Sequence, residues 1–418
     1  MSVKTELKKI WKILSESTNI PALILATTIG LVGIGFLLPI LPVYLKQKGI
    51  SFLELGYIIS AAGAASMILK PFIGYFSDKF GRKIIIISSY FLQGALTPLY
   101  LVINNVTGLA LVQAGRNAAS SISQPTIGAM IGDVAPEEGR ATLFGFYSSI
   151  QSFVYAAALF GGGILLVWGL QIHQIFYVTA GCLFISTLVL AIFLKETVEK
   201  ESESPAPSPE SPPQPINKFK RLLVSSAAAL AERNSLGLIL YAFFFMFSLA
   251  VYPIYISLFA VEVFGAAEGL LGPIIAVSWV TFAVVQPFGG WLSDWLGKRK
   301  ILILIGFILL FIFNTALALS PTLLWMVVLW ALIGVGDGMS RPVMNALIVD
   351  VVPPHKRGTY FGTLGFFRGL ANITAPLVYG YMAEFYSIRW AFLTTSVTLG
   401  LSLLIIGVLI KEKQVIGE

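Results

Sequence analysis

The sequence has little charge, one cysteine and two histidines. Charged residues make up 12% of its 418 residues, whereas about a quarter of the residues of a soluble globular protein are charged. The single cysteine, Cys182, leaves no partner for a disulfide within the chain and no cysteine-based metal cluster. His173 and His355 fall in separate predicted loops, so they cannot share a metal ion. The sequence therefore predicts no metal, no cofactor and no ordinary soluble enzyme.

Hydrophobic residues are abundant instead. They account for 56% of the chain, and the mean hydropathy is +0.84. A helix that crosses a bilayer uses about 20 apolar residues, so the sequence predicts an all-α membrane protein with twelve transmembrane helices. The apolar runs place these helices at residues 20–45, 54–77, 84–104, 107–133, 141–168, 171–194, 236–261, 266–293, 301–320, 322–350, 358–384 and 387–410.

The net charge of +7 reflects where the basic residues lie. Most lysines and arginines fall in the termini and in loops that share one side of the predicted membrane, and only Lys46, Lys48 and Arg389 fall on the other side. Because cytoplasmic loops are enriched in Lys and Arg, the pattern predicts a multi-pass protein of the cell membrane with both termini in the cytoplasm. Membrane topology therefore explains the basic charge, and binding to nucleic acid is not expected.

The chain is expected to have two lobes joined by a linker. Residues 1–194 form the first lobe and begin with a basic amphipathic segment, which we expect to lie on the membrane surface. Residues 195–234 form a cytoplasmic linker rich in Pro, Ser and Glu, followed by a basic amphipathic stretch. Such a composition cannot build a core. Residues 235–418 form the second lobe.

The two lobes repeat each other in sequence. GYFSDKFGRK at 74–83 matches GWLSDWLGKRK at 290–300, and a second match relates the segment from Asp133 to Gly145 to the segment from Asp350 to Gly362. Both matches have nearly the same offset, and six helices separate the copies. The copies therefore have the same orientation in the membrane, as in parallel repeats. The sequence predicts two parallel, pseudo-symmetric six-helix bundles.

These motifs resemble those of the major facilitator superfamily, and the resemblance extends over the whole chain. The loop motif of that family, Gly-x-x-x-Asp-x-x-Gly-Arg-Lys, is filled by Gly74, Asp78, Gly81, Arg82 and Lys83. In the second copy Lys298 stands for the first basic residue. An arginine in the fourth helix, here Arg116, also fits the family. The resemblance implies two bundles around a central cavity that opens to each side in turn and is lined mainly by helices one, four, seven and ten.

The loop motif is expected to act as a gating latch. Asp78 would contact the start of the eleventh helix near Gly358, since a carboxylate is favourable at a helix N-terminus. Arg82 and Arg140 would pair with Asp133 or Asp78. The alternative is that these charges only anchor the loop and direct membrane insertion. The residues of the expected latch are Gly74, Asp78, Gly81, Arg82, Lys83, Asp133, Arg140, Asp294, Gly297 and Arg357.

Charged residues inside a membrane helix are costly, so they mark functional positions. Asp337 is the only carboxylate near the middle of a predicted helix, and Arg341 follows it by one turn on the same face. Arg368 reaches a similar depth on the next helix. Asp337 could release and take up a proton as it moves between water and these arginines. Alternatively, the three residues hold helices together, or they contact the substrate.

Arg116 has no acidic neighbour in the first lobe, so it is expected to serve coupling or gating, to bind an anion, or to contact backbone carbonyls. Polar and aromatic residues on the same helices are candidates for the cavity wall, although packing and lipid contact are the default for each. These residues are Gln113, Asn117, Gln124, Gln151, Tyr155, Tyr241, Tyr252 and Asn345.

The direction of transport is left open by two opposing features. Efflux antiporters of the family carry Gly-Pro-x-x-Gly-Gly on helix five, and this chain keeps only the final Gly161 and Gly162. Pro39 and Pro42 on helix one resemble drug-efflux members. The expected function is a monomeric secondary transporter for a small amphipathic or organic solute, coupled to protons and favouring efflux. The alternatives are an uncoupled facilitator and a transporter-like sensor that does not transport.

Overall fold

The computed structural model describes residues 18–134, 140–197, 233–352 and 357–410. Within these ranges, the side chains of residues 70–79, 140–142, 294, 349, 351 and 357–359 are outside the description. The expected surface segment at the N-terminus and most of the expected linker, including Lys218, Lys220 and Arg221, therefore lie outside the described residues.

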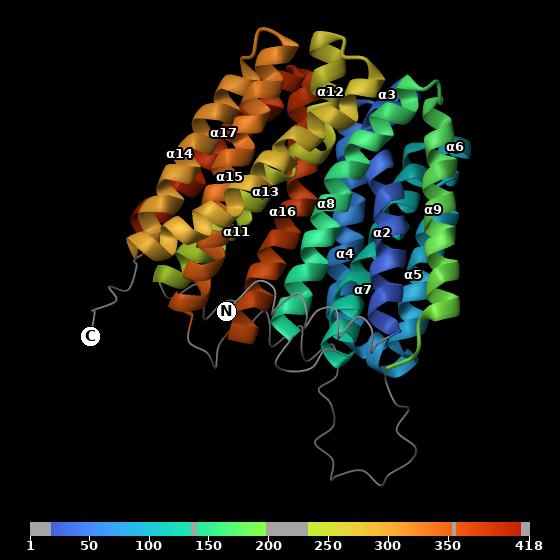
Figure 1. Cartoon of the computed structure of the whole chain (residues 1–418). Helices are drawn as coiled ribbons and strands as arrows, with labels where there is room; N and C mark the ends of the chain where they lie inside the picture. The colour runs from blue at the N-terminus through green and yellow to red at the C-terminus, as the bar shows by residue number, and fades with distance from the viewer. Residues whose placement is uncertain (1–17, 135–139, 198–232, 353–356, 411–418) are drawn as a thin grey trace, which may run out of the picture. The chain divides into compact units, whose positions relative to one another are not determined.

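Every regular element in the described ranges is a helix, and no strand occurs there (Figure 1). The first half contains α2 (Asn19–Leu37), α3 (Leu41–Gln47), α4 (Phe52–Phe80), α5 (Arg82–Leu96), α6 (Leu99–Val102), α7 (Val106–Val134), α8 (Arg140–Val167) and α9 (Ile172–Phe193). The second half contains α11 (Arg233–Leu249), α12 (Tyr252–Phe264), the 3₁₀ turn η2 (Glu268–Leu270), α13 (Leu271–Leu296), α14 (Arg299–Ala318), α15 (Leu323–Val351), α16 (Arg357–Phe385) and α17 (Ile388–Leu409).

Ten stretches of the described chain are long and apolar enough to cross a membrane. Two further helices, α7 and α16, have 29 residues each but contain more polar side chains. Large apolar residues such as Phe153, Trp168 and Leu324 are exposed on the helix surfaces, as expected where lipid is the solvent. The all-helical membrane fold expected from the sequence is confirmed.

Three spans expected to be continuous are each built from two helices. The breaks lie between α2 and α3, between α5 and α6, and between α11 and α12, next to Pro39, Pro98 and Pro253. Proline lacks an amide donor and its ring clashes with the preceding turn, so a helix ends easily beside it. The break after Leu249 places freed backbone carbonyls inside the second half of the chain.

The helices form two compact units. Unit 1 contains the described residues of Met1–Leu38 and Ala65–Pro215, and unit 2 contains those of Pro39–Ala64 and Ile216–Glu418. Residues 39–64, which we expected in the first lobe, thus pack with the second half of the chain. The lobe boundaries expected from the sequence, with residues 195–234 as the linker, remain a prediction.

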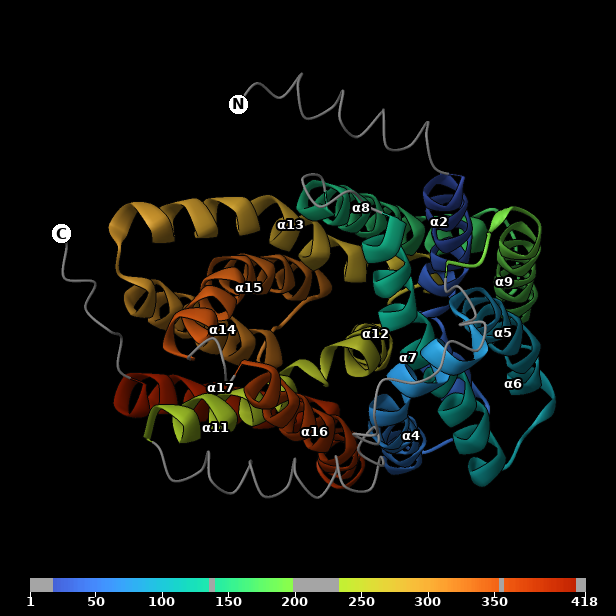
Figure 2. The ribbon, with the colours of Figure 1, turned by 90° about the horizontal axis from the view of Figure 1, so that it is seen from below.

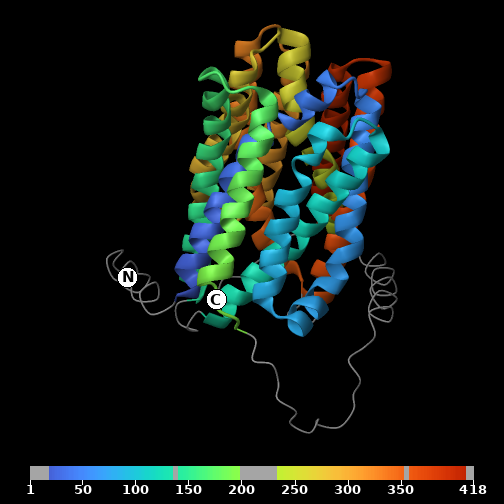
Figure 3. The same ribbon diagram turned by 90° about the vertical axis from the view of Figure 1, so that its right-hand side faces the viewer.

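Unit 1 is organised around α2, which packs on α8 and α9, while α5 packs on α7 and α9 (Figure 2). Figure 3 shows these blue-to-green helices running side by side. Leu23, Ile86, Met130, Leu143 and Leu190 belong to five different helices and meet in one buried core. Gly162 on α8 allows this packing, because an added Cβ would lie 2.8 Å from Cα of Phe36 on α2.

In unit 2, α15 packs on α13 and α14, and α11 packs on α16 and α17 (Figure 2). Buried aromatic rings fill the space between these helices. The ring centroids of Phe259 and Phe392 are 4.9 Å apart, and those of Phe245 and Phe307 are 5.2 Å apart. Since α14 packs on α15 and α11 packs on α16, these rings help position the two helices that carry the charged residues discussed below.

Candidate functional site

The central feature of unit 2 is an ion pair in the middle of α15. Nε of Arg341 donates to Oδ1 of Asp337 at 2.8 Å, and a second guanidinium nitrogen contacts Oδ2. The two residues are one helical turn apart, as the sequence predicted. The side chain of Asp337 is 13% exposed and that of Arg341 is 32% exposed. The pair is therefore largely withdrawn from solvent but still reachable.

Arg368 on α16 does not complete the expected cluster of one acid and two bases. Among the described side chains, Arg368 has no carboxylate within ion-pair distance, and Asp337 pairs with Arg341 alone. Arg368 instead interacts electrostatically with Tyr241 on α11, and Arg341 and Asp337 also interact electrostatically with this tyrosine. Tyr241 thus marks the place where charges from α15 and α16 converge.

Aromatic rings surround this place. Tyr241 stacks on Phe245 with ring centroids 5.4 Å apart. The guanidinium carbon of Arg341 lies 4.8 Å from the ring centroid of Phe282 and 5.9 Å from that of Phe245. A cation over an aromatic face is attracted by the ring quadrupole. The rings therefore help hold Arg341 in place while it pairs with Asp337.

A buried polar network lies at the break between α11 and α12, and sequence analysis did not identify it. Asn314 on α14 is fully buried and donates to the backbone oxygen of Phe392 and to Oγ of Ser396, each at 2.8 Å. It also accepts from the hydroxyl of Tyr252 at 3.0 Å. Tyr379 donates to the backbone oxygen of Phe247 at 2.9 Å. These bonds satisfy side-chain polar groups of Asn314, Tyr252 and Tyr379 that would otherwise be unpaired in hydrocarbon.

Arg116 lies on α7 in unit 1 beside Tyr100, whose ring centroid is 5.6 Å from the guanidinium carbon. The hydroxyl of Tyr100 is hydrogen-bonded to the side-chain oxygen of Gln113. Nε of Arg116 is buried without a hydrogen-bond partner among the described residues. No described carboxylate pairs with this arginine. Its role remains a prediction.

The other candidates for the cavity wall differ in their surroundings. Gln151 donates to Oγ1 of Thr27 at 2.8 Å, which ties α8 to α2. The hydroxyl of Tyr252 donates its hydrogen bond to Asn314, as described above. Gln124 and Asn345 are exposed, and Asn117 and Tyr155 are partly buried. None of these surroundings by itself assigns a residue to a solute-binding wall.

The loop motif forms an ion pair in unit 1 that links three helices. The guanidinium of Arg82, at the start of α5, contacts the carboxylate of Asp133, at the end of α7. Glu196, which follows α9, accepts from the backbone amides of Arg82 at 3.0 Å and Lys83 at 3.1 Å. A carboxylate in this position satisfies free amides and the helix dipole of α5. Thr197 adds a hydrogen bond to Asp133 at 3.1 Å.

The same pair recurs in unit 2, but with a different residue from the one we expected. Arg299, at the start of α14, lies 2.5 Å from Oδ2 of Asp350, at the end of α15. Arg299 and Asp350 each follow Arg82 and Asp133 by 217 positions. Lys298 is therefore an inserted residue. The sequence alignment had suggested that it takes the place of Arg82, and that prediction is wrong. We refer to Arg82–Asp133 and Arg299–Asp350 as the repeated ion pairs.

The lysines that follow these arginines also correspond. Nζ of Lys83 donates to the backbone oxygen of Ala191 near the end of α9 at 3.0 Å. Nζ of Lys300 donates to the backbone oxygens of Gly407 and Ile410 at the end of α17, at 2.8 and 2.7 Å. The last carbonyls of a helix lack internal partners, so each lysine caps a neighbouring helix.

The remaining residues of the expected latch fall outside the described side chains. These residues are Gly74, Asp78, Arg140, Asp294 and Arg357, together with Gly358. Gly81 and Gly297 are described, and both have positive φ, at +91° and +62°. The glycines therefore make the turns of the motif, and the contact expected of Asp78 remains a prediction.

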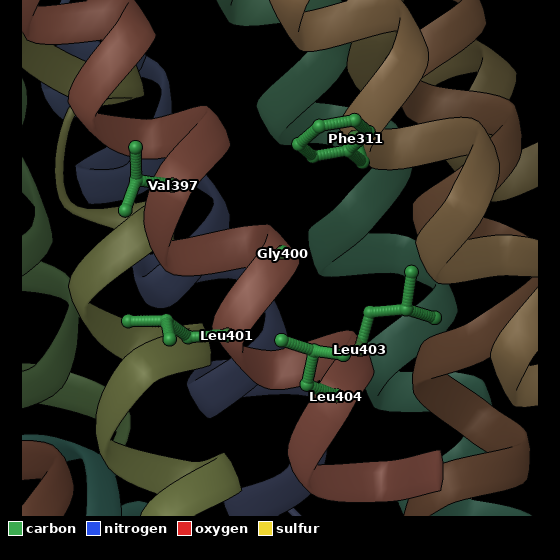
Figure 4. A pocket seen from close by; sticks show the side chains of 6 residues that line it. All are labelled: Phe311, Val397, Gly400, Leu401, Leu403 and Leu404. Carbon is green, nitrogen blue, oxygen red and sulfur yellow. The ribbon is translucent and has the colours of Figure 1, made fainter.

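A separate pocket of about 360 Å³ lies between α14 and α17 (Figure 4). Its lining residues are Phe311, Val397, Gly400, Leu401, Leu403 and Leu404. None of them carries a polar side chain, and Val397 and Leu404 are mostly exposed on the helix surface. Such a surface matches lipid chains. It has no group that would orient a polar solute, so it is not the candidate site.

Comparison with known proteins agrees with this architecture. The model of the Major Facilitator Superfamily matches residues 23–280 and 238–415. An uncharacterized MFS-type transporter of Methanocaldococcus jannaschii is 24% identical over 88% of this chain and 92% of its own. Quinolone resistance protein NorA of Staphylococcus aureus is 30% identical over 41% of this chain and 44% of its own.

Solved structures show the same fold. A bacterial homolog of the human lysosomal transporter Spinster, in an inward-facing and unoccupied conformation, superposes with a TM-score of 0.75 at 16% identity. The match covers 93% of this chain and 95% of that one. Because the family model spans nearly the whole sequence and the structure is built from the same repeated helices, this chain belongs to the Major Facilitator Superfamily of membrane transporters.

Proposed function

We propose that the protein is a monomeric secondary active transporter of the cell membrane that works by alternating access. It moves a small amphipathic or organic solute in exchange for protons, with export as the favoured direction. Both termini lie in the cytoplasm, as the distribution of basic residues predicts. The two sequence repeats act as lobes that move against each other.

The observation that carries this proposal is the ion pair of Asp337 and Arg341. A carboxylate far from both ends of a membrane helix is expensive and is a functional position by default. In the structure, Arg341 contacts both carboxylate oxygens, and this contact favours the charged form of Asp337. A change in the contacts of Arg341 would remove that support and let Asp337 bind a proton. Proton binding is thereby linked to conformation.

Two weaker observations support export and gating. Over part of its length the chain resembles NorA, whose name describes resistance to quinolones. The repeated ion pairs hold the ends of helices on the loop-motif side, where we propose that Asp78 meets the start of α16 when that side is closed. An uncoupled facilitator has no need of a buried carboxylate, and a sensor has no need of two copies of the loop motif.

The test uses purified protein in proteoliposomes that contain a pH-sensitive dye. A quinolone and a panel of small organic solutes are added against an imposed proton gradient. We expect solute-dependent proton movement with the native protein, and none with Asp337→Asn, because the amide cannot carry a proton. Proton-coupled flux that is unchanged in Asp337→Asn would refute coupling at this residue.

The matched control is Glu262→Gln. Glu262 is an exposed acid near the end of α12, and the substitution makes the same chemical change away from the pair. We expect normal flux from this variant. Solute flux without proton movement in the native protein, with the same flux in Asp337→Asn, would indicate the uncoupled facilitator instead.

A further inference from the structure

Acidic residues are confined to the ends of the membrane helices, with one exception. Of the acidic residues that lie within the described helices, all but Asp337 are within three residues of a helix end. The acids at helix ends are Glu54, Asp78, Asp133, Glu262, Glu268, Asp294, Asp350 and Glu384. Arginines are not confined in this way, because Arg116, Arg341 and Arg368 all lie about three turns from a helix end. The interior of the membrane helices therefore carries more positive than negative charge.

Within unit 2 the excess positive charge can be assigned to one side chain. Both oxygens of Asp337 are engaged by Arg341 in a two-pronged contact, a geometry in which a guanidinium and a carboxylate neutralise each other efficiently. Arg341 is further held by the ring of Phe282. Arg368 is left as the positive charge that no described carboxylate neutralises.

The position of Arg368 argues against a lipid phosphate as its partner. Arg368 is eleven residues from the start of α16, and α16 has 29 residues. At 1.5 Å per residue it lies about 16 Å from the nearer end of the helix, far from the headgroups that flank a span. A charge at this depth is costly unless it faces water or a polar or anionic partner.

The surroundings of Arg368 also suit an apolar body. Phe367 directly precedes it on α16 and is partly exposed. Phe282 on α13 is partly exposed beside Arg341. Solute sites are typically apolar surfaces with a few polar groups that fix orientation. Here the fixed polar group is a cation.

We propose that the solute is an organic anion whose carboxylate, or an equivalent acidic group, binds Arg368 while its apolar part contacts the partly exposed aromatic rings of unit 2. This inference rests on the proposed transport function and narrows its substrate class. Arg368 is the residue that selects anions over neutral and cationic molecules of the same shape. The Asp337–Arg341 pair is the separate, proton-binding element.

The test measures equilibrium binding to the purified full-length protein. Three probes share one aromatic body and differ in charge: 2-naphthoate, its neutral amide 2-naphthamide, and the cation 2-naphthylmethylammonium. We expect the carboxylate to bind about tenfold or more tightly than the amide, which corresponds to about 1.4 kcal/mol, and the cation to bind most weakly. Arg368→Gln should remove this preference but keep the weak binding of the amide, which reports that the site is still folded.

Two further variants sharpen the result. Arg368→Lys keeps the charge but loses the planar fork, so we expect it to retain part of the preference for the carboxylate. Lys298→Gln makes the same loss of charge at an exposed loop residue and should leave binding of all three probes unchanged. An anionic phospholipid, phosphatidylglycerol, is added as a competitor and should not displace the naphthoate.

The proposal is overturned if none of the probes binds, if the amide or the cation binds as tightly as the carboxylate, or if Arg368→Gln keeps the preference. Displacement by phosphatidylglycerol overturns it in favour of a lipid site. These outcomes differ from failure of the proposed function, in which naphthoate binds selectively but no solute crosses the membrane in proteoliposomes.

Discussion

Gly81 and Gly297 occupy the same place in the two copies of the loop motif but have different backbone conformations. Gly297 has φ 62° and ψ 10°, the left-handed conformation common at helix ends. Gly81 has φ 91° and ψ 144°, a region that is nearly restricted to glycine. A Cβ at Gly81 would also lie 2.5 Å from Oε2 of Glu196, whereas one at Gly297 would meet nothing within 4 Å.

The two glycines therefore predict unequal effects of the same substitution. We expect Gly81→Asn to lower the free energy of unfolding by about 1–3 kcal/mol and to disturb the capping of α5 by Glu196. Gly297→Asn should have a much smaller effect, because asparagine tolerates the left-handed conformation. Thermal unfolding in detergent compares the two variants. Equal losses of stability would contradict the assigned conformations.

Asn314 is the second residue whose surroundings lead to a firm expectation. Replacing it by leucine removes two donated bonds and one accepted bond at a buried position. Leaving buried partners unsatisfied costs about 1–3 kcal/mol, although the cost in membranes is often at the low end. We expect Asn314→Leu to lower the melting temperature and Asn345→Leu, at an exposed position of α15, to leave it unchanged.

At the scale of helices, the repeated ion pairs tie the start of one membrane helix to the end of the following long helix. In unit 1 they join α5 to α7, and in unit 2 they join α14 to α15. Each pair is partly exposed, so its contribution to stability is modest. Because each pair lies where two helix ends meet, its main contribution is to fix the position of one helix end relative to the other.

The one-residue insertion in the second copy of the loop motif predicts which of its basic residues is needed for transport. We expect Arg299→Ala and Arg82→Ala both to impair transport, because each removes the partner of the aspartate at the end of the following long helix. Lys298→Ala should be tolerated. Transport assays on the three variants at equal expression test this, and impairment by Lys298→Ala with normal Arg299→Ala would restore the alignment without an insertion.

The sequence predicted the helices well because hydrophobic runs of this length have few alternatives in a membrane. It also predicted the Asp337–Arg341 pair, since residues one turn apart share a helix face. It did not predict the breaks at Pro39, Pro98 and Pro253, because a proline inside a membrane helix can be tolerated without a break, as at Pro342 and Pro376.

Two further misses have physical reasons. Arg299 was overlooked because a one-residue insertion in a loop shifts the alignment without changing the fold. Glu196 was assigned to the linker because its contact depends on how the chain leaves α9. The Asn314 network depends on packing among α11, α14 and α17, which no pattern within a single helix can reveal.

At the scale of the whole molecule, the informative feature is that residues 39–64 pack within unit 2 although they belong to the first sequence repeat. The contact between α4 and α16 is close. A Cβ on Gly56 would lie 2.3 Å from the backbone oxygen of Pro376, and one on Gly63 would lie 2.8 Å from that of Asn372. Ser60 donates to the backbone oxygen of Ile373 at 2.6 Å.

Proline explains part of this contact. Because Pro376 has no amide hydrogen, the carbonyl of Asn372 one turn earlier has no helical donor. The carbonyls of this turn of α16 are therefore open to approach by another helix, and α4 presents Gly56, Ser60 and Gly63 to them. Small residues at such positions let two helices approach closely in a membrane. Because this contact joins helices of the two sequence repeats, we expect it to open and close during the transport cycle.

A large side chain at Gly56 should therefore prevent the contact from closing. We expect Gly56→Leu to fold and to bind solute but to lose transport, while Gly145→Leu, at an exposed helical glycine with no atom near its Cβ position, transports normally. In a Cys182→Ser background, Ser60→Cys reports the contact directly, because Ser60 is 5% exposed. A membrane-impermeant maleimide should label this cysteine slowly in the otherwise native protein and faster when Gly56→Leu is added. Equal labelling with normal transport would show that the contact between α4 and α16 is not part of the transport cycle.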